Sequence, residues 1–136
     1  MKKQRNGRVK LESKNVFGER LEPCCKFPMT GFARDGYCRL FKEDMGEHTV
    51  CVEMTDEFLA FSKEAGNDLS EPIEAYDFPG LIAGDRWCLC ALRWVEAYNA
   101  GAAPKVVLSA TDQSMLNYVP LQILQNFAVD ETEDVI

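Results

Sequence analysis

The chain has 136 residues, of which 46% are hydrophobic and 27% charged, and its net charge at pH 7 is −7. This length is typical of one domain with a buried core, and the hydrophobic content excludes a generally disordered chain. The longest apolar runs fall far short of the roughly 20 residues of a membrane span, so we expect no membrane association.

Residues 1–14 are predicted to form a basic flexible arm. They contain six Lys or Arg residues and one Glu, so they carry +5 and leave −12 on the rest of the chain. Because the arm holds no aromatic residue for base stacking and the remainder is acidic, we expect no nucleic-acid partner. No apolar stretch follows the arm, so we expect no secretory signal and a cytoplasmic location. In that compartment the six cysteines would be mostly free thiols.

One globular domain is predicted over residues 15–129, opening with a short strand at 15–17. Residues 24–47 then form a long loop that prolines and glycines punctuate and that holds three of the six cysteines. Loops of this length are often functional. The alternation over 48–54 predicts a strand, and a helix follows with Thr55 as its N-cap and Gly66 as its end.

The second half begins with another long loop over 69–86, in which Pro79-Gly80 favours a type II turn. A buried strand is predicted over 104–110, a short helix capped by Thr111 over 111–119, and a last helix over 120–129. Residues 130–136 are predicted to be an acidic flexible tail. This order predicts a single compact α+β domain: a few-stranded sheet, about four helices and two long ordered loops.

The stretch GDRWCLCALRWVEAYNAG, residues 84–101, fits two structures. A helix is favoured because Asp85 suits an N-cap, Gly101 suits a stop, and Trp87 and Trp94 would share an inward flank. The alternative is a strand over 86–92 followed by a shorter helix. A helix sets Cys88 and Cys90 about 200° apart and puts Cys88 in the first turn, where a thiol pKa is lowered; a strand puts both cysteines on one face.

The residue inventory limits the chemistry. His48 is the only histidine, so any nucleophile–histidine pair must use it, although a lone histidine at a strand start is more often a hydrogen-bonded structural residue. The cysteine spacing lacks C-x-x-C and zinc-type pairs, so we predict no metal and no cofactor, although distant cysteines can still converge. Phosphate-binding and dinucleotide-binding motifs are absent from the sequence.

Several segments together resemble one family, and the most specific are TGFARDGYC and GDRWCLC, supported by LEPCC, HTVC, FSKEAGNDLS and FPGL. The family is Domain of Unknown Function 2237, a group of small, mostly bacterial proteins without an established activity. The resemblance covers Asn15 to Asp130. It implies that six residues match motif positions and share a thiol-lined feature: Cys24, Cys38, His48, Cys51, Cys88 and Cys90.

Three functional hypotheses follow, and the sequence does not decide whether the protein is an enzyme. The leading one is a small cytosolic structural or binding domain whose Cys, Trp and Gly motifs organise the long loops, with an unknown small molecule or protein as partner. The second is a ligand or metal pocket lined by Cys24, Cys38, His48, Cys51 and Cys88. The third is a thiol enzyme with Cys88 as nucleophile and His48 as base. The further candidate ligand-binding residues are Arg34, Asp35, Arg86, Trp87 and Cys90.

Overall fold

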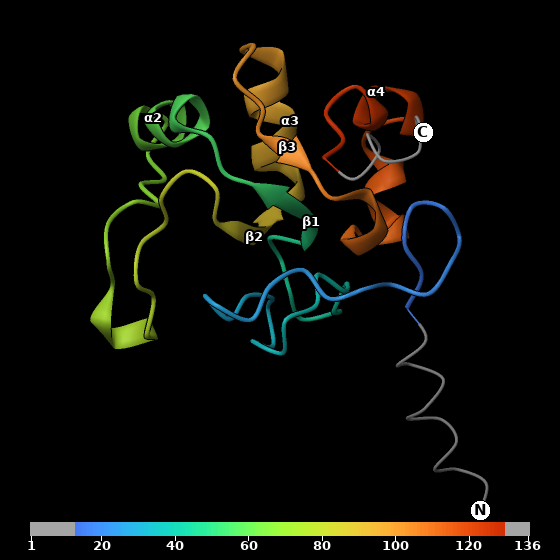
Figure 1. Cartoon of the computed structure of the whole chain (residues 1–136), viewed down its shortest axis with the longest axis horizontal. Coiled ribbons are helices and arrows are strands. Elements are labelled where there is room, and N and C mark those ends of the chain that lie inside the picture. The colour runs from blue at the N-terminus through green and yellow to red at the C-terminus, as the bar shows by residue number, and fades with distance from the viewer. Residues whose placement is uncertain (1–12, 130–136) are drawn as a thin grey trace, which may run out of the picture.

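A small antiparallel sheet lies at the centre of the domain (Figure 1). The computed structural model describes residues 13–129. Its strands are β1 (His48–Glu53), β2 (Arg86–Cys90) and β3 (Lys105–Val106), in the order β2-β1-β3. Helices α2 (Asp56–Glu64), α3 (Ala91–Asn99) and α4 (Leu121–Gln125) lie on one side of the sheet, and the segment before β1 lies on the other (Figure 1).

The α+β class and the few-stranded sheet are confirmed, and the helix count differs slightly from the prediction. Three α-helices occur among the described residues, together with 3-10 helices at Glu74–Tyr76, Leu108–Ala110 and Gln113–Asn117. The last of these replaces the helix predicted over 111–119. Its N-cap is Asp112, whose carboxylate accepts from the Ser114 backbone N–H at 2.9 Å, and not Thr111.

Other predicted elements are shorter than expected. The strand at 15–17 is reduced to isolated bridges, and only two residues of 104–110 form β3. Helix α2 matches its prediction: Thr55 Oγ1 accepts from the Phe58 N–H at 3.1 Å, and Gly66 has the positive φ of 95° that ends a helix. The predicted arm and acidic tail fall almost entirely on residues 1–12 and 130–136, outside the described part.

The continuous helix favoured over 84–101 is wrong, and the alternative of a strand followed by a shorter helix is correct, although the strand ends at Cys90 and not at residue 92. Residues 86–90 form a strand that pairs with β1, and the helix begins only at Ala91. Asp85 does not cap a helix; its carboxylate accepts from the Ile82 N–H at 3.0 Å. Pairing with β1 satisfies the inner edge of 86–90, and the alternating side chains can then reach opposite faces of the sheet. Trp87 and Trp94 are both buried, as predicted, but they lie on different elements.

The sheet separates two hydrophobic clusters. The larger one, on the helix side, combines strand residues such as Val50 and Val52 with Phe58 of α2 and Trp94 of α3. The Trp94 indole donates to the Pro104 carbonyl at 3.2 Å, so its buried polar atom is satisfied. The smaller cluster, on the loop side, consists of the side chains of Cys24, Cys38, Cys51, Cys88, Val107 and Ala110.

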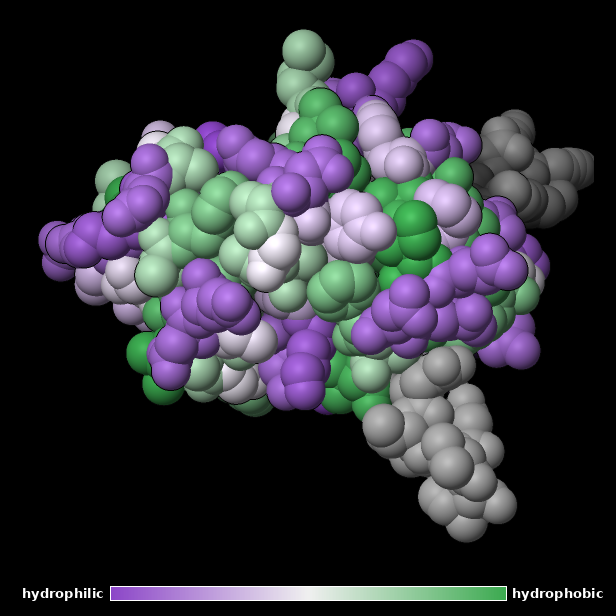
Figure 2. Space-filling view, turned by 90° about the horizontal axis from the view of Figure 1, so that it is seen from above, coloured by the Kyte–Doolittle hydropathy of each residue, from purple (hydrophilic) through white to green (hydrophobic). Residues whose placement is uncertain are grey.

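The outer surface of the helix layer is mixed in character. Viewed from above, hydrophilic residues are spread among hydrophobic ones (Figure 2). Leu92 of α3 is 60% exposed. Within residues 13–129, every helix is too short or too polar to cross a membrane.

Candidate functional site: a cysteine cluster beside an aromatic cleft

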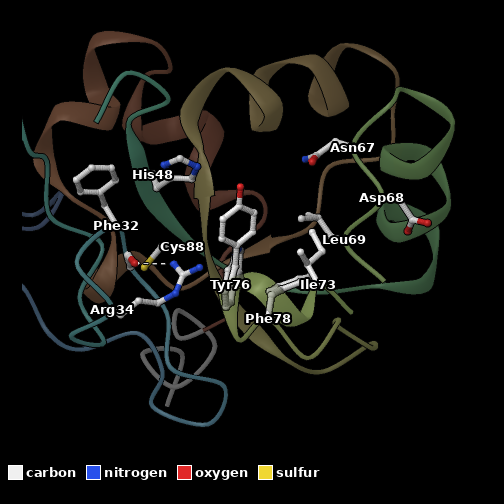
Figure 3. A pocket seen from close by; sticks show the side chains of 12 residues that line it. Phe32, Arg34, His48, Asn67, Asp68, Leu69, Ile73, Tyr76, Phe78 and Cys88 are labelled. Atoms are coloured by element: carbon white, nitrogen blue, oxygen red, sulfur yellow. Dashed lines mark hydrogen bonds between the residues drawn. The ribbon is translucent and has the colours of Figure 1, made fainter. Parts of the chain in front are cut away.

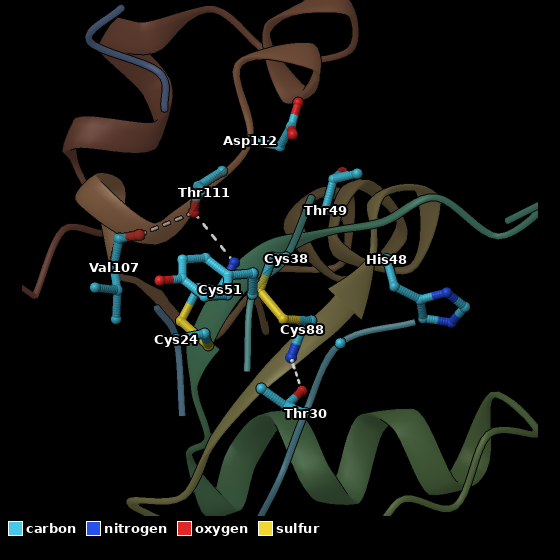
Figure 4. The surroundings of a disulfide bond; sticks show 12 residues. Cys24, Thr30, Cys38, His48, Thr49, Cys51, Cys88, Val107, Thr111 and Asp112 are labelled. Carbon is cyan, nitrogen blue, oxygen red and sulfur yellow. Dashed lines mark hydrogen bonds between the residues drawn. A yellow bond between two sulfur atoms is a disulfide. The ribbon is translucent and has the colours of Figure 1, made fainter. Parts of the chain in front are cut away.

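Four of the six cysteines converge on the loop side of the sheet (Figure 4). Cys51 and Cys88 are directly opposite each other on β1 and β2, and each bonds to a cysteine of the 24–47 loop. The disulfides are Cys24–Cys51 and Cys38–Cys88. All four residues are buried, and the sulfurs of Cys24, Cys38 and Cys88 lie within 4.8 Å of one another.

This arrangement corrects two predictions. Four of the cysteines are not free thiols; Cys25 and Cys90, both partly exposed, are the free ones. Cys88 lies in the middle of a strand, so the helix-terminus argument for lowering its thiol pKa does not hold. Cys90 is the last residue of β2 and lies two residues from Cys88, outside the cluster.

Two buried hydroxyl groups fix the strands that carry the cluster (Figure 4). Thr30 Oγ1 accepts from the Cys88 N–H at 2.7 Å, so the 24–47 loop covers the outer edge of β2. Thr111 Oγ1 accepts from the Cys51 N–H at 3.1 Å and donates to the Val107 carbonyl at 2.9 Å. Both threonines thus satisfy backbone groups of buried residues.

A cleft of 660 Å³ adjoins the cluster, between the 24–47 loop and the 67–78 segment (Figure 3). Phe78 packs edge-on against Trp87, with ring centroids 5.1 Å apart, and forms part of the cleft wall. Most side chains that line the cleft are aromatic or aliphatic. The lining residues are Gly31, Phe32, Arg34, His48, Asn67, Asp68, Leu69, Ile73, Tyr76, Phe78, Trp87 and Cys88.

Arg34 supplies the positive charge of the cleft. Its guanidinium lies 5.2 Å from the centroid of the Trp87 ring, and Nη1 donates to the Gly31 carbonyl at 2.9 Å. Among residues 13–129 it has no carboxylate partner, whereas Arg39, Arg86 and Arg93 each pair with one. An unpaired guanidinium stacked on an aromatic face, in an acidic domain, is available to an anionic ligand.

Backbone strain gathers around the same cleft. Arg34, Glu47 and Asp77 are the non-glycine residues with positive φ in the described part, at 55°, 50° and 54°. Arg34 lines the cleft, Glu47 precedes His48, and Asp77 follows Tyr76. Left-handed backbone is costly for such residues and is often retained at functional sites.

His48 contributes a polar group with a fixed orientation. The buried Asp44 carboxylate accepts from the His48 backbone N–H and lies 2.8 Å from Nδ1. Because a carboxylate accepts, this contact places a proton on Nδ1 and leaves Nε2 as the ring nitrogen that His48 can offer to a ligand. Its ring points away from the Cys38–Cys88 disulfide (Figure 4), so no free Cys88 thiol stands beside a His48 base. The catalytic roles predicted for Cys88 and His48 stay predictions.

The cleft brings together only some of the predicted ligand-binding residues. Arg34, Trp87, His48 and Cys88 line it, but Asp35 pairs with Arg39 at 3.2 Å and Arg86 pairs with Glu53 at 3.4 Å. The aromatic wall residues Phe32, Tyr76 and Phe78 were not predicted from the sequence. Their only sequence signal is that both long loops carry aromatic residues, and the sequence does not reveal that the loops face each other.

Asp68 at the cleft rim is a fixed negative charge. The Ser70 hydroxyl and then the Ser70 N–H donate to its carboxylate, at 2.6 and 3.0 Å, and these bonds lower the pKa of Asp68. Figure 3 places Asp68 at the opposite end of the cleft from Arg34. An anionic group of a ligand is therefore expected at the Arg34 end.

Residues 14–128 match the model of a family described as "Uncharacterized protein conserved in bacteria (DUF2237)". The match covers most of the chain, so the protein belongs to this family, and the resemblance seen in the sequence motifs is confirmed. No curated protein matches the chain.

Proposed function

We propose that this protein is a binding domain for a small anionic ligand with a flat, largely apolar body. The observation that carries the proposal is the unpaired Arg34 guanidinium, stacked on Trp87 inside an aromatic-lined cleft. The cleft volume of 660 Å³ falls within the roughly 300–1,000 Å³ range of small-molecule sites. The proposal refines the leading hypothesis of a domain whose motif residues organise long loops.

Each part of the cleft has a distinct task in binding. The exposed rings of Phe32 and Tyr76 offer stacking and dispersion contacts to a flat ligand. Arg34 supplies charge-assisted hydrogen bonds to its anionic group. Because Trp87 and the Gly31 carbonyl already hold the Arg34 side chain, little rotamer freedom is lost on binding.

The disulfides support the cleft by fixing one of its walls. Cys24 and Cys38 flank the residues from Thr30 to Arg34, and both are bonded to the sheet. The loop wall therefore faces the 67–78 segment in a set position. In this reading the cysteines act on binding through the geometry of Arg34.

Anilinonaphthalene sulfonate, an aromatic anion that fluoresces when bound, is a suitable probe. We expect the wild-type protein to bind it at one saturable site. In Arg34→Asn, affinity should fall about tenfold or more, because a hydrogen bond to a charged group contributes about 1.5–3 kcal/mol. Asparagine tolerates left-handed backbone, so this variant removes the charge with little added strain.

Two further variants make the test specific. Arg93→Asn removes a half-buried arginine of α3, outside the cleft, and should leave the affinity unchanged. Tyr76→Ala truncates a largely exposed wall residue and should weaken binding without destabilising the fold. Equal affinities for Arg34→Asn and the wild type, both natively folded by circular dichroism, would refute the proposed site.

A further inference from the structure

Apart from the ligand cleft, the four clustered cysteines offer the number and type of ligands of a closed metal site. They come from distant parts of the sequence, yet their side chains form one buried cluster. The sulfurs of Cys24, Cys38 and Cys88 lie within 4.8 Å of one another, and Cys51 is bonded to Cys24. In a tetrahedral zinc–thiolate site with bonds of about 2.3 Å, adjacent sulfurs are about 3.8 Å apart.

We propose that, when reduced, Cys24, Cys38, Cys51 and Cys88 bind one Zn²⁺ ion as a structural site. The non-bonded sulfurs need to approach, by up to about 1 Å among Cys24, Cys38 and Cys88 and by more for Cys51, which lies outside that group, and the bonded ones need to separate to about 3.8 Å. Rotation of the cysteine side chains can supply both movements, because the strand pairing of Cys51 with Cys88 already sets two ligands face to face. Four buried protein ligands leave no open position, as in structural zinc sites.

Conversion of the disulfide form into the zinc form begins with reduction. Each disulfide takes two electrons and two protons from a dithiol reductant, which itself becomes a disulfide, so the two bonds yield four thiols. Zn²⁺ then displaces four protons to solvent and leaves a site of charge −2.

Zinc and the disulfides would have the same structural role. Either one links Cys24 and Cys38 of the loop to Cys51 and Cys88 of the sheet. Zinc is the metal that a four-thiolate tetrahedral set favours. The redox state around the protein then decides which link is present.

Metal titration of the reduced full-length chain tests the site. The protein is reduced with a phosphine under anaerobic conditions, freed of reductant and titrated with Zn²⁺, with bound metal measured by elemental analysis. We expect one tightly bound zinc per chain. Co²⁺ in its place should give the charge-transfer and d–d absorption of a tetrahedral thiolate site.

Alkylation mapping on the wild type identifies the ligands without relying on a variant that fails to fold. Zinc should protect Cys24, Cys38, Cys51 and Cys88 and leave Cys25 and Cys90 reactive. Cys51→Ser and Cys88→Ser should lose stoichiometric zinc, and the matched controls Cys25→Ser and Cys90→Ser should keep it. A reduced wild type that binds no stoichiometric zinc, or zinc that protects Cys25 and Cys90 equally, would overturn the proposal. The Arg34 binding test involves no metal, so the two proposals fail independently.

Discussion

Reducing the two disulfides, in the absence of metal, should remove a large part of the stability of this domain. The bonds join residues 27 and 50 positions apart. The loop-entropy relation gives about 3.5 kcal/mol for the first bond alone and about 4 kcal/mol for the second. The two loops share residues 38–51, so the combined effect should be below the sum, at about 4–7 kcal/mol. Small domains have total stabilities of about 5–15 kcal/mol.

Urea unfolding of oxidised and phosphine-reduced wild type, both with a chelator present, measures this loss. The two samples have the same sequence, so only the S–S bonds differ. We expect a lower midpoint on reduction and a steeper dependence on urea, because the reduced chain unfolds to a more expanded state. A double variant, Cys25→Ala with Cys90→Ala, should lose as much stability on reduction as the wild type does, since neither residue forms a disulfide. A midpoint that barely moves on reduction would show that the cluster does not hold the 24–47 loop.

Three further predictions concern single residues. Trp94→Ala should cost about 3–5 kcal/mol in the free energy of unfolding, whereas Leu92→Ala, at a 60% exposed site of the same helix, should cost under about 0.5 kcal/mol; similar costs would contradict the burial of Trp94. The Tyr118 hydroxyl donates to the Glu47 carboxylate at 2.8 Å, which raises the pKa of Tyr118, so the bond should stabilise the fold below pH 10 and be lost as the pH rises through the folded pKa. Phenolate absorbance should show a lower Tyr118 pKa in Glu47→Gln, and an unchanged value would exclude this contact. Thr30→Val should cost about 1–3 kcal/mol and speed hydrogen exchange at the Cys88 amide, because that buried N–H loses its acceptor, whereas Thr30→Ser should keep both near wild type.

Strand β1 and helix α2 could be predicted from the sequence because their signals are local. Alternation over 48–54 matches a strand with one face toward the aliphatic core and the other toward the cysteines. Thr55 begins the helix and Gly66 ends it, each through contacts within one turn of the chain. Such contacts form whatever the rest of the fold does.

Strand β2 could not be predicted in this way. Residues 86–90 form a short apolar run that is compatible with a helix or a strand, and the tryptophan spacing suited a helix. What decides the conformation is a partner 33 or more residues earlier: β1 supplies the hydrogen bonds that make residues 86–90 a strand. Tertiary pairing of this kind overrides local propensity.

The candidate site depends on the same non-local pairing. Only with Cys51 opposite Cys88 in the sheet do two cysteines present their sulfurs to one side, where the loop cysteines meet them. The preference for free thiols followed from an expected compartment, which says nothing about distances between sulfurs. The cleft is also a product of tertiary structure, since its two walls come from loops far apart in the sequence.

The cluster and the cleft are coupled because they share one short segment. The anchors Cys24 and Cys38 enclose Thr30, which caps the edge of β2, and Arg34, which reaches over Trp87. Releasing both anchors would free a wall that also carries the strained Arg34 backbone, and that strain would then relax. Binding of an aromatic anion should therefore weaken when the cluster is reduced and metal-free, and recover when either the disulfides or a bound ion joins the loop to the sheet again.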